Sequence, residues 1–85
     1  MLTFELVTPE RQILTTQAHR VELPATGGDM GVLAGHSPTM TTIRDGEVRV
    51  YAQAGATAQR ISVTGGFAEV NETSVTLLAE SAELV

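Results

Sequence analysis

The sequence predicts an all-β protein, built as an antiparallel sandwich or flattened barrel of about ten short strands. Short runs in which apolar and polar residues alternate recur along the chain, and Gly, Pro and Asp residues separate them. No helical period persists over a long window before the tail. Only three aromatic residues occur among 85, so we expect a thin core of Val, Ile, Leu and Ala between two sheets.

The amino-terminal half contains four expected strands. In the first, Leu2, Phe4 and Leu6 lie on one face, which is the period-two signature of a strand with one buried side. A turn at Pro9 follows it, and Pro24 ends the third strand or places it at a sheet edge. The four strands are expected at residues 2–8, 11–18, 20–23 and 30–33.

The clearest local signal lies at residues 39–51, where Asp45 and Gly46 separate two alternating runs. Asp-Gly at the centre of a two-residue loop is typical of a type I′ β-hairpin. Counting outward from this turn pairs Ile43 with Val48 on an apolar face and places the charged side chains on the other. The sequence therefore predicts an antiparallel hairpin whose two strands pair with each other.

The remaining strands are expected at residues 59–63, 66–70 and 74–79. Residues 52–58 are small and without pattern, which is typical of the tip of a hairpin. Gly65 and Gly66 are expected to form a further turn. The tail from Leu77 onward contains good helix formers but is too short to hold a helix by itself.

Composition argues against several classes of protein. The length of 85 residues is that of one small domain. The formal net charge is -5 and the basic residues form no cluster, so nucleic acid is not an expected partner. The absence of cysteine excludes disulfides and thiolate metal sites. No apolar run is long enough to span a bilayer, and the start shows no signal segment, so we expect no direct bilayer insertion.

No catalytic, cofactor-binding or metal site is predicted. The only candidate bases near neutral pH are His19 and His36, whose spacing is not that of a zinc site. His36 could act as a base for the hydroxyl of Ser37 or Thr39, but adjacent side chains tend to point apart and no third triad member is placed. The chain has no lysine, so its glycines do not form a P-loop.

Residues 27–38, GGDMGVLAGHSP, are expected to form a shaped loop that serves as a docking surface. Four glycines permit unusual backbone conformations there, and shaped loops on small scaffolds usually carry contacts. Exposure of Met30, Val32 and Leu33 would leave apolar area for a partner to cover. The alternative is an ordinary wide turn in a small β protein.

Four sequence blocks in a fixed order carry a resemblance to a known family. They are FELVTPER (4–11), GDMGVLAGHSP (28–38), VTGGFAEV (63–70) and VTLLAES (75–81). Together they resemble the amino-terminal domain of the epsilon subunit of F-type ATP synthases, called delta in mitochondria. The resemblance implies a β-sandwich domain at residues 1–81. It places residues 82–85 at the start of a tail, where family members continue into a helical hairpin that these residues do not include.

The resemblance implies a non-catalytic rotor subunit of the central stalk, at the cytoplasmic face of the bacterial inner membrane. Such a subunit fastens gamma to the c-ring and couples proton-driven rotation to the alpha/beta head. By motif, the ring-facing residues would be Asp29, Met30, Gly31 and Val32. The gamma-facing residues would be Thr8, His36 and Thr41, and the structural turns would lie at Asp45, Gly46, Gly65 and Gly66. The carboxylate of Asp29 would meet Arg and polar groups of the ring loops.

Two readings from other classes stay open at this point. The first is a small ligand-binding β domain that holds a sugar or similar metabolite in its glycine loop. Such a site needs exposed aromatic side chains for stacking, and Tyr51 is the only candidate. The second is a hydrolase that uses His36, which the missing triad partner disfavours.

Overall fold

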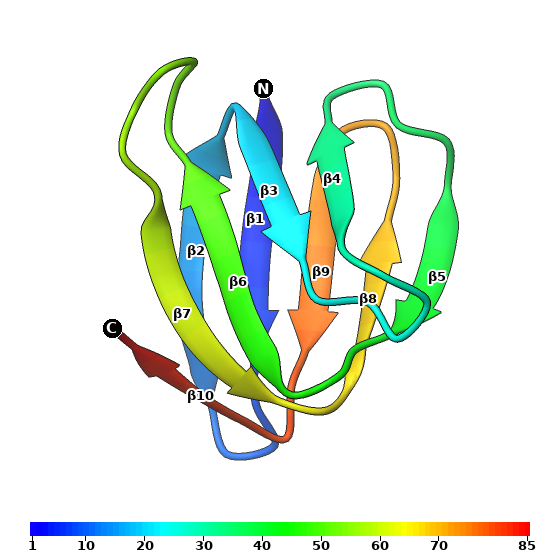
Figure 1. Ribbon diagram of the computed structural model, residues 1–85, viewed down its shortest axis with the longest axis vertical. Helices are drawn as coiled ribbons and strands as arrows, with labels where there is room; N and C mark the ends of the chain where they lie inside the picture. Colours follow the sequence, from blue (N-terminus) through cyan, green and yellow to red (C-terminus); the bar gives the residue numbers. More distant parts are fainter.

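The computed structural model describes residues 1–85 as two five-stranded sheets packed face to face (Figure 1). Sheet A has the order β2-β1-β9-β8-β5, and sheet B has the order β10-β7-β6-β3-β4. Neighbouring strands are antiparallel except β1 and β9, which run parallel. The predicted all-β sandwich is therefore confirmed. The strands are β1 (Leu2–Val7), β2 (Gln12–Ala18), β3 (Arg20–Leu23), β4 (Met30–Leu33), β5 (Thr39–Thr42), β6 (Gly46–Tyr51), β7 (Gln59–Thr64), β8 (Phe67–Val70), β9 (Ser74–Leu78) and β10 (Ser81–Leu84).

The core is a single apolar cluster of 17 buried residues between the sheets. Leu2, Phe4 and Leu6 of β1 are completely buried, as their alternation predicts. Val75 and Leu77 come from the neighbouring strand β9 and are also completely buried. Each such side chain contributes roughly 1.5–3 kcal/mol to the free energy of unfolding, so this layer is the main source of stability.

The predicted hairpin at residues 39–51 is wrong, because its two strands lie in different sheets. β5 pairs with β8 in sheet A, whereas β6 pairs with β3 and β7 in sheet B. A type I′ turn needs positive φ at both central residues, and neither Asp45 nor Gly46 has one. Ile43 and Val48 are nevertheless buried as predicted, because alternation determines which face is inward and not which strand is the neighbour.

Two crossovers between the sheets lie side by side at residues 43–45 and 65–66. The backbone N–H of Gly65 donates to Oδ1 of Asp45 at 2.9 Å, and the N–H of Ile43 donates to the carbonyl of Gly66 at 2.9 Å. Gly66 has φ 109°, and a Cβ there would lie 1.9 Å from the carbonyl oxygen of Leu78. Glycine is therefore required at position 66 by both conformation and space.

The chain end belongs to the sandwich. Residues 82–84, which the sequence analysis places in a tail, continue β10, and β10 pairs antiparallel with β7 from Ser81↔Thr64 to Leu84↔Ile61. β7 would otherwise be an edge strand with unpaired backbone groups, so this pairing outweighs the helical propensity of a short segment. No helix of the length and apolarity needed to cross a membrane is present.

Candidate functional site

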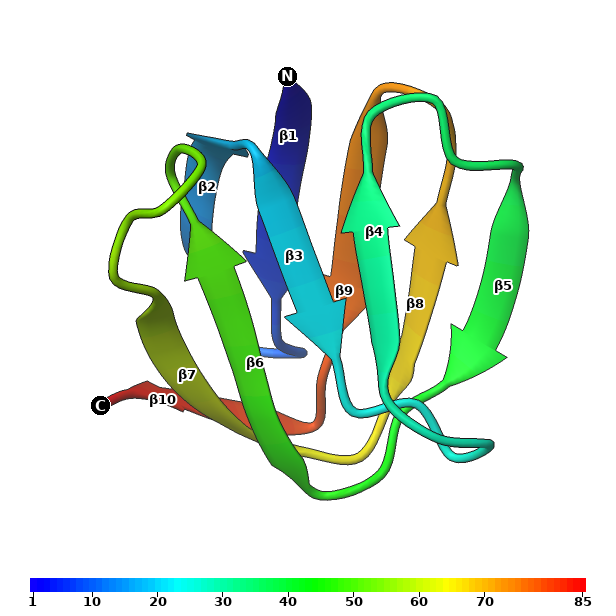
Figure 2. The same cartoon turned by 45° about the horizontal axis from the view of Figure 1, so that its top comes forward.

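Loops from both sheets gather at each end of the sandwich. The connections that follow β1, β3, β5, β7 and β9 lie at the bottom of Figure 1. We call these connections the lower end, and they comprise residues 8–11, 24–29, 43–45, 65–66 and 79–80. The loop at 34–38 crosses the opposite, upper end and joins β4 to β5 at one side of the sandwich (Figures 1 and 2). The glycine-rich segment at 27–38 is thus divided between the two ends by β4.

The ring-facing candidate Asp29 ends the loop at 24–29, and Arg44 holds it there. Its side chain is 75% exposed, and Oδ1 accepts a hydrogen bond from Nη2 of Arg44 at 2.6 Å. Ala25 forms a β-bridge with Ile43, and the N–H of Thr26 donates to the carbonyl of Thr42 at 3.0 Å. The loop is therefore tied to the end of β5 and the β5–β6 crossover through residues 24–26 and through Asp29.

The other ring-facing candidates, Met30, Gly31 and Val32, form part of β4 at the edge of sheet B. The expectation that Val32 is exposed is wrong, because its side chain is completely buried opposite Val21. Strand alternation turns Val32 into the core, while Met30 is half-buried and packs against it. Of the apolar residues expected to be exposed, Leu33 alone is clearly so, at 50%.

The three gamma-facing candidates are not brought together. Thr8 follows β1 at the lower end, is only 9% exposed, and donates its hydroxyl to the carbonyl of Arg11 at 3.2 Å. His36 lies in the upper loop, where its Nδ1 is 2.7 Å from the carbonyl oxygen of Ser37. Thr41 is half-buried on β5 opposite the buried Ala68. These residues do not form one contiguous surface.

An apolar surface that the sequence analysis missed lies on the outer face of sheet A. Val7, Leu78 and Phe67 are neighbours in register across β1, β9 and β8, and we call them the apolar row. Leu78 is 36% exposed and Phe67 is 41% exposed. An open groove of about 460 Å³ runs beside them, with Thr8 and Pro9 in its wall.

A sequence signal for the apolar row exists. In β8, Ala68 and Val70 alternate as inward residues, which leaves Phe67 on the face that is normally polar. In β9, Leu78 breaks the same alternation after Leu77. Large apolar side chains at outward positions of two neighbouring strands indicate a covered surface. The signal can be used only once β9 is known to lie between β1 and β8.

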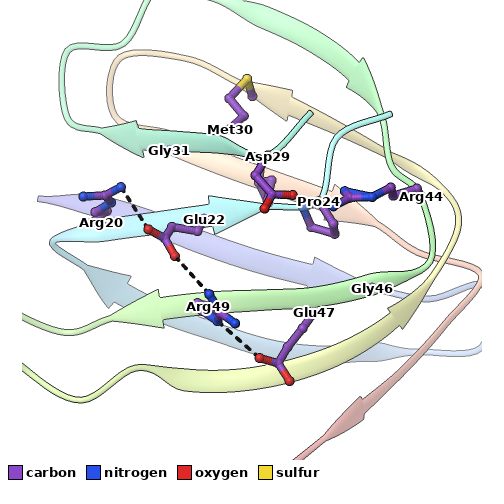
Figure 3. A pocket seen from close by; sticks show the side chains of 11 residues that line it. Arg20, Glu22, Pro24, Asp29, Met30, Gly31, Arg44, Gly46, Glu47 and Arg49 are labelled. Carbon is purple, nitrogen blue, oxygen red and sulfur yellow. Dashed lines mark hydrogen bonds and ion pairs between the residues drawn. The ribbon is translucent and has the colours of Figure 1, made fainter. Parts of the chain in front are cut away.

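The outer face of sheet B carries charged side chains instead, seen from close by in Figure 3. Arg20 and Glu22 are 2.9 Å apart, Glu22 and Arg49 3.9 Å, Arg49 and Glu47 3.2 Å, and Glu47 and Arg60 3.8 Å. We call these five residues the charge ladder. Between the charge ladder and the Asp29–Arg44 pair lies a cavity of about 390 Å³ with Pro24, Met30 and the two glycines 31 and 46 in its wall. Such exposed pairs each contribute about 0–1 kcal/mol to stability.

The side chains considered for other chemistry are engaged within the chain. His36 contacts a backbone carbonyl rather than a serine or threonine hydroxyl, so no nucleophile–base pair is formed there. Tyr51, the stacking candidate, donates its hydroxyl to Glu22 at 3.2 Å and so belongs with the charge ladder. No three His, Asp or Glu side chains lie where they could share a metal ion.

Comparison with known protein families identifies the fold. The family model described as the β-sandwich domain of the ATP synthase delta/epsilon chain matches residues 1–85. The chain belongs to this ATP synthase delta/epsilon family. The family resemblance inferred from the four sequence blocks is thereby confirmed.

Individual relatives agree with the family assignment. The chain is 46% identical over 84 residues to ATP synthase epsilon chain 1 of Cereibacter sphaeroides, covering 99% of this chain and 62% of that protein. It is 53% identical over 79 residues to the ATP synthase epsilon chain of Sinorhizobium fredii, covering 93% of this chain and 58% of that protein. The chain thus spans less than two thirds of the length of these delta/epsilon family members.

Solved structures show the same sandwich. A chain in the cryo-EM structure of the Euglena gracilis mitochondrial ATP synthase, with OSCP, F1 and the c-ring, has TM-score 0.87 and 28% identity. The alignment covers 98% of this chain and 52% of that one. A chain of the Tetrahymena thermophila mitochondrial ATP synthase central stalk and c-ring has TM-score 0.78 at 10% identity over 96% of this chain and 65% of that one, and shows the fold alone.

Proposed function

We propose that this chain is a non-catalytic rotor component of an F-type ATP synthase that fastens the gamma subunit to the c-ring. In this role it couples proton-driven rotation to the alpha/beta head from the cytoplasmic face of a bacterial inner membrane. Family membership over residues 1–85 and the likeness to a chain of an F1/c-ring assembly support the proposal. The observation that carries it is the presence of two unlike exposed surfaces on one small sandwich, the apolar row and the loop that ends at the Asp29 carboxylate.

The apolar row is the surface that we assign to gamma. Phe67 and Leu78 are large, partly exposed side chains held on neighbouring strands, and Met40 on the same face of β5 is 65% exposed. A specific interface covers about 800 Å² on each partner and centres on a few large anchors. An aromatic anchor beside a groove fits that description, and Thr8 in the groove wall belongs to this surface.

The loop at 24–29 is the surface that we assign to the c-ring. Asp29 holds a mostly exposed carboxylate at the lower end, on a loop tied to a crossover by backbone hydrogen bonds. A charge-assisted hydrogen bond to a ring cation would be short and directional. A contact of this kind on a tied loop can transmit torque, because the loop cannot swing away from the sandwich.

The sandwich between these surfaces is suited to a mechanical linkage. One of its 52 backbone hydrogen bonds, from the N–H of Ile43 to the carbonyl of Gly66, ties the 43–45 crossover to the 65–66 crossover. The carboxylate of Asp45 adds a second tie by accepting from the N–H of Gly65. The apolar row is attached through β8 directly to the second crossover, and Asp29 is attached through Arg44 to the first. Force applied at Asp29 can therefore reach the outer face of sheet A through the Arg44 ion pair and the two hydrogen-bonded crossovers.

Binding measurements test the proposal directly. The purified chain should be captured by isolated gamma subunit and, in a separate assay, by purified c-ring. Asp29→Lys should lower ring capture and proton pumping by the assembled synthase while leaving gamma capture unchanged. Glu83→Lys reverses another exposed carboxylate, on β10, and is the matched control. Failure of the wild-type chain to bind either partner would overturn the proposed function.

A further inference from the structure

Arg44 makes three contacts with the loop that carries Asp29. Its backbone N–H donates to the carbonyl of Pro24 at 2.9 Å. Its guanidinium donates through Nη1 to the carbonyl of Ala25 at 3.3 Å and through Nη2 to Oδ1 of Asp29 at 2.6 Å. One residue of the β5–β6 crossover thus holds both the beginning and the end of the loop.

The tip of this loop is closed by one backbone hydrogen bond, from the N–H of Gly28 to the carbonyl of Ala25 at 3.0 Å. A Cβ placed at Gly27 or Gly28 would meet no atom within 4 Å, so the space beside these two residues is open. The carboxylate of Asp29 is mostly exposed, and Oδ1 is the oxygen that accepts the bond from Arg44. Figure 3 shows the Arg44 side chain extending toward Asp29. The guanidinium of Arg44 is the one group of the chain that bonds to the Asp29 carboxylate.

We propose that Arg44 is a positioning residue that presents the Asp29 carboxylate to a cationic group of the c-ring. The inference rests on the proposed function. Arg44 occupies Oδ1 and leaves Oδ2 for the incoming cation, since a carboxylate can accept bonds at both oxygens. The guanidinium suits this role because its planar fork donates to a carbonyl and a carboxylate at once.

Arg44 has two opposing effects on ring binding: its charge repels a second cation, and its hydrogen bond orders the Asp29 side chain. We expect the ordering of Asp29 to have the larger effect on affinity. The positive charge of Arg44 repels a second cation, but between exposed groups this repulsion is reduced by water and salt. Without Arg44, ring binding would have to order the Asp29 side chain, and ordering a side chain on binding lowers affinity. We therefore expect Arg44→Ala to weaken ring binding about tenfold rather than to strengthen it.

A double-mutant cycle tests the inference. The dissociation constant for purified c-ring is measured for the wild-type chain, Arg44→Ala, Asp29→Asn and the double variant. Arg44→Ala should bind about tenfold more weakly, and the double variant should bind no more weakly than Asp29→Asn, because Arg44 acts through Asp29. Arg44→Lys should recover part of the affinity, since an ammonium can pair with Asp29 without reproducing the fork.

Arg60→Ala is the matched control, because Arg60 is similarly exposed and pairs with Glu47 at 3.8 Å on β6. It should leave ring affinity unchanged. Wild-type affinity in Arg44→Ala, or an equal loss from Arg44→Ala with and without Asp29, would overturn the positioning role. If the wild-type chain binds no ring, both the proposed function and this inference fail. If Asp29→Asn weakens binding while Arg44→Ala does not, the inference alone fails.

Discussion

The outer faces of the two sheets follow the same strand alternation and differ in what fills the outward positions. On sheet A, the apolar row of Val7, Leu78 and Phe67 leaves apolar surface in water. On sheet B, the charge ladder pairs cations with carboxylates within the chain. Covering the outer face of sheet A with a partner lowers the free energy, because apolar surface leaves water. Covering the outer face of sheet B would remove water from charged groups that are already paired within the chain, which is unfavourable. The comparison favours the outer face of sheet A for the proposed interface.

The largest expected effect comes from the crossover that connects sheet B to the apolar row. Gly66→Ala places a methyl group 1.9 Å from the carbonyl oxygen of Leu78. We expect a loss of about 3–4 kcal/mol in the free energy of unfolding, measured by urea denaturation. The control Gly55→Ala also has positive φ but has open space around it, and should cost about 1–2 kcal/mol. An equal loss of unfolding free energy in Gly66→Ala and Gly55→Ala would show that the backbone moves to relieve the close contact at position 66.

The next effect separates binding from folding on sheet A. Leu78→Asp should weaken gamma binding about 100-fold, or about 2.7 kcal/mol, because a charge replaces an anchor of the apolar row. Unfolding stability should fall by about 1–2 kcal/mol, since the Leu78 side chain is only 36% exposed, and the chain should remain folded. Leu33→Asp, at an exposed position on β4, is the control and should bind gamma normally. Normal gamma binding by Leu78→Asp would contradict the assignment of the outer face of sheet A to the gamma interface.

A smaller effect is expected at the centre of the charge ladder. Glu22 lies 2.9 Å from Arg20 and accepts the hydroxyl of Tyr51 at 3.2 Å. Glu22→Ala should lower unfolding stability by about 1 kcal/mol without changing gamma affinity. Glu83→Ala removes an exposed carboxylate of β10 and should change stability very little. A loss of gamma binding in Glu22→Ala would contradict the division of roles between the two outer faces.

The smallest effect is the response of the two interfaces to salt. Raising NaCl from about 0.05 M to about 0.5 M should weaken ring binding about threefold, because the Asp29 contact is exposed and electrostatic. Gamma binding should stay constant within about twofold or increase slightly, since salt does not screen apolar contacts. Titration of both partners by surface plasmon resonance gives the two responses. Salt-sensitive gamma binding would indicate a charged rather than apolar interface.

Much of the local structure could be predicted from alternation and turn chemistry. The strands at Leu2–Val7, Arg20–Leu23 and Met30–Leu33 lie within one residue of their predicted positions, and Ile43 and Val48 are inward as expected. The candidate site was predicted less well. Asp29 is exposed at a loop end, but Val32 is core and the apolar row was not identified. Side-chain periodicity encodes burial within a strand and says nothing about its neighbours.

Period-two alternation, glycine positions and motif order are local properties of the chain, and they were enough to predict the fold class, most of the inward strand residues and the family. Tertiary structure alone decided that β5 and β6 belong to different sheets, that residues 82–84 extend the sandwich, and that Arg44 meets Asp29. Each of these depends on which segments distant in the sequence become neighbours. The pairing of distant segments is decided when both sheets bury their apolar faces together, so it cannot be predicted from any one segment.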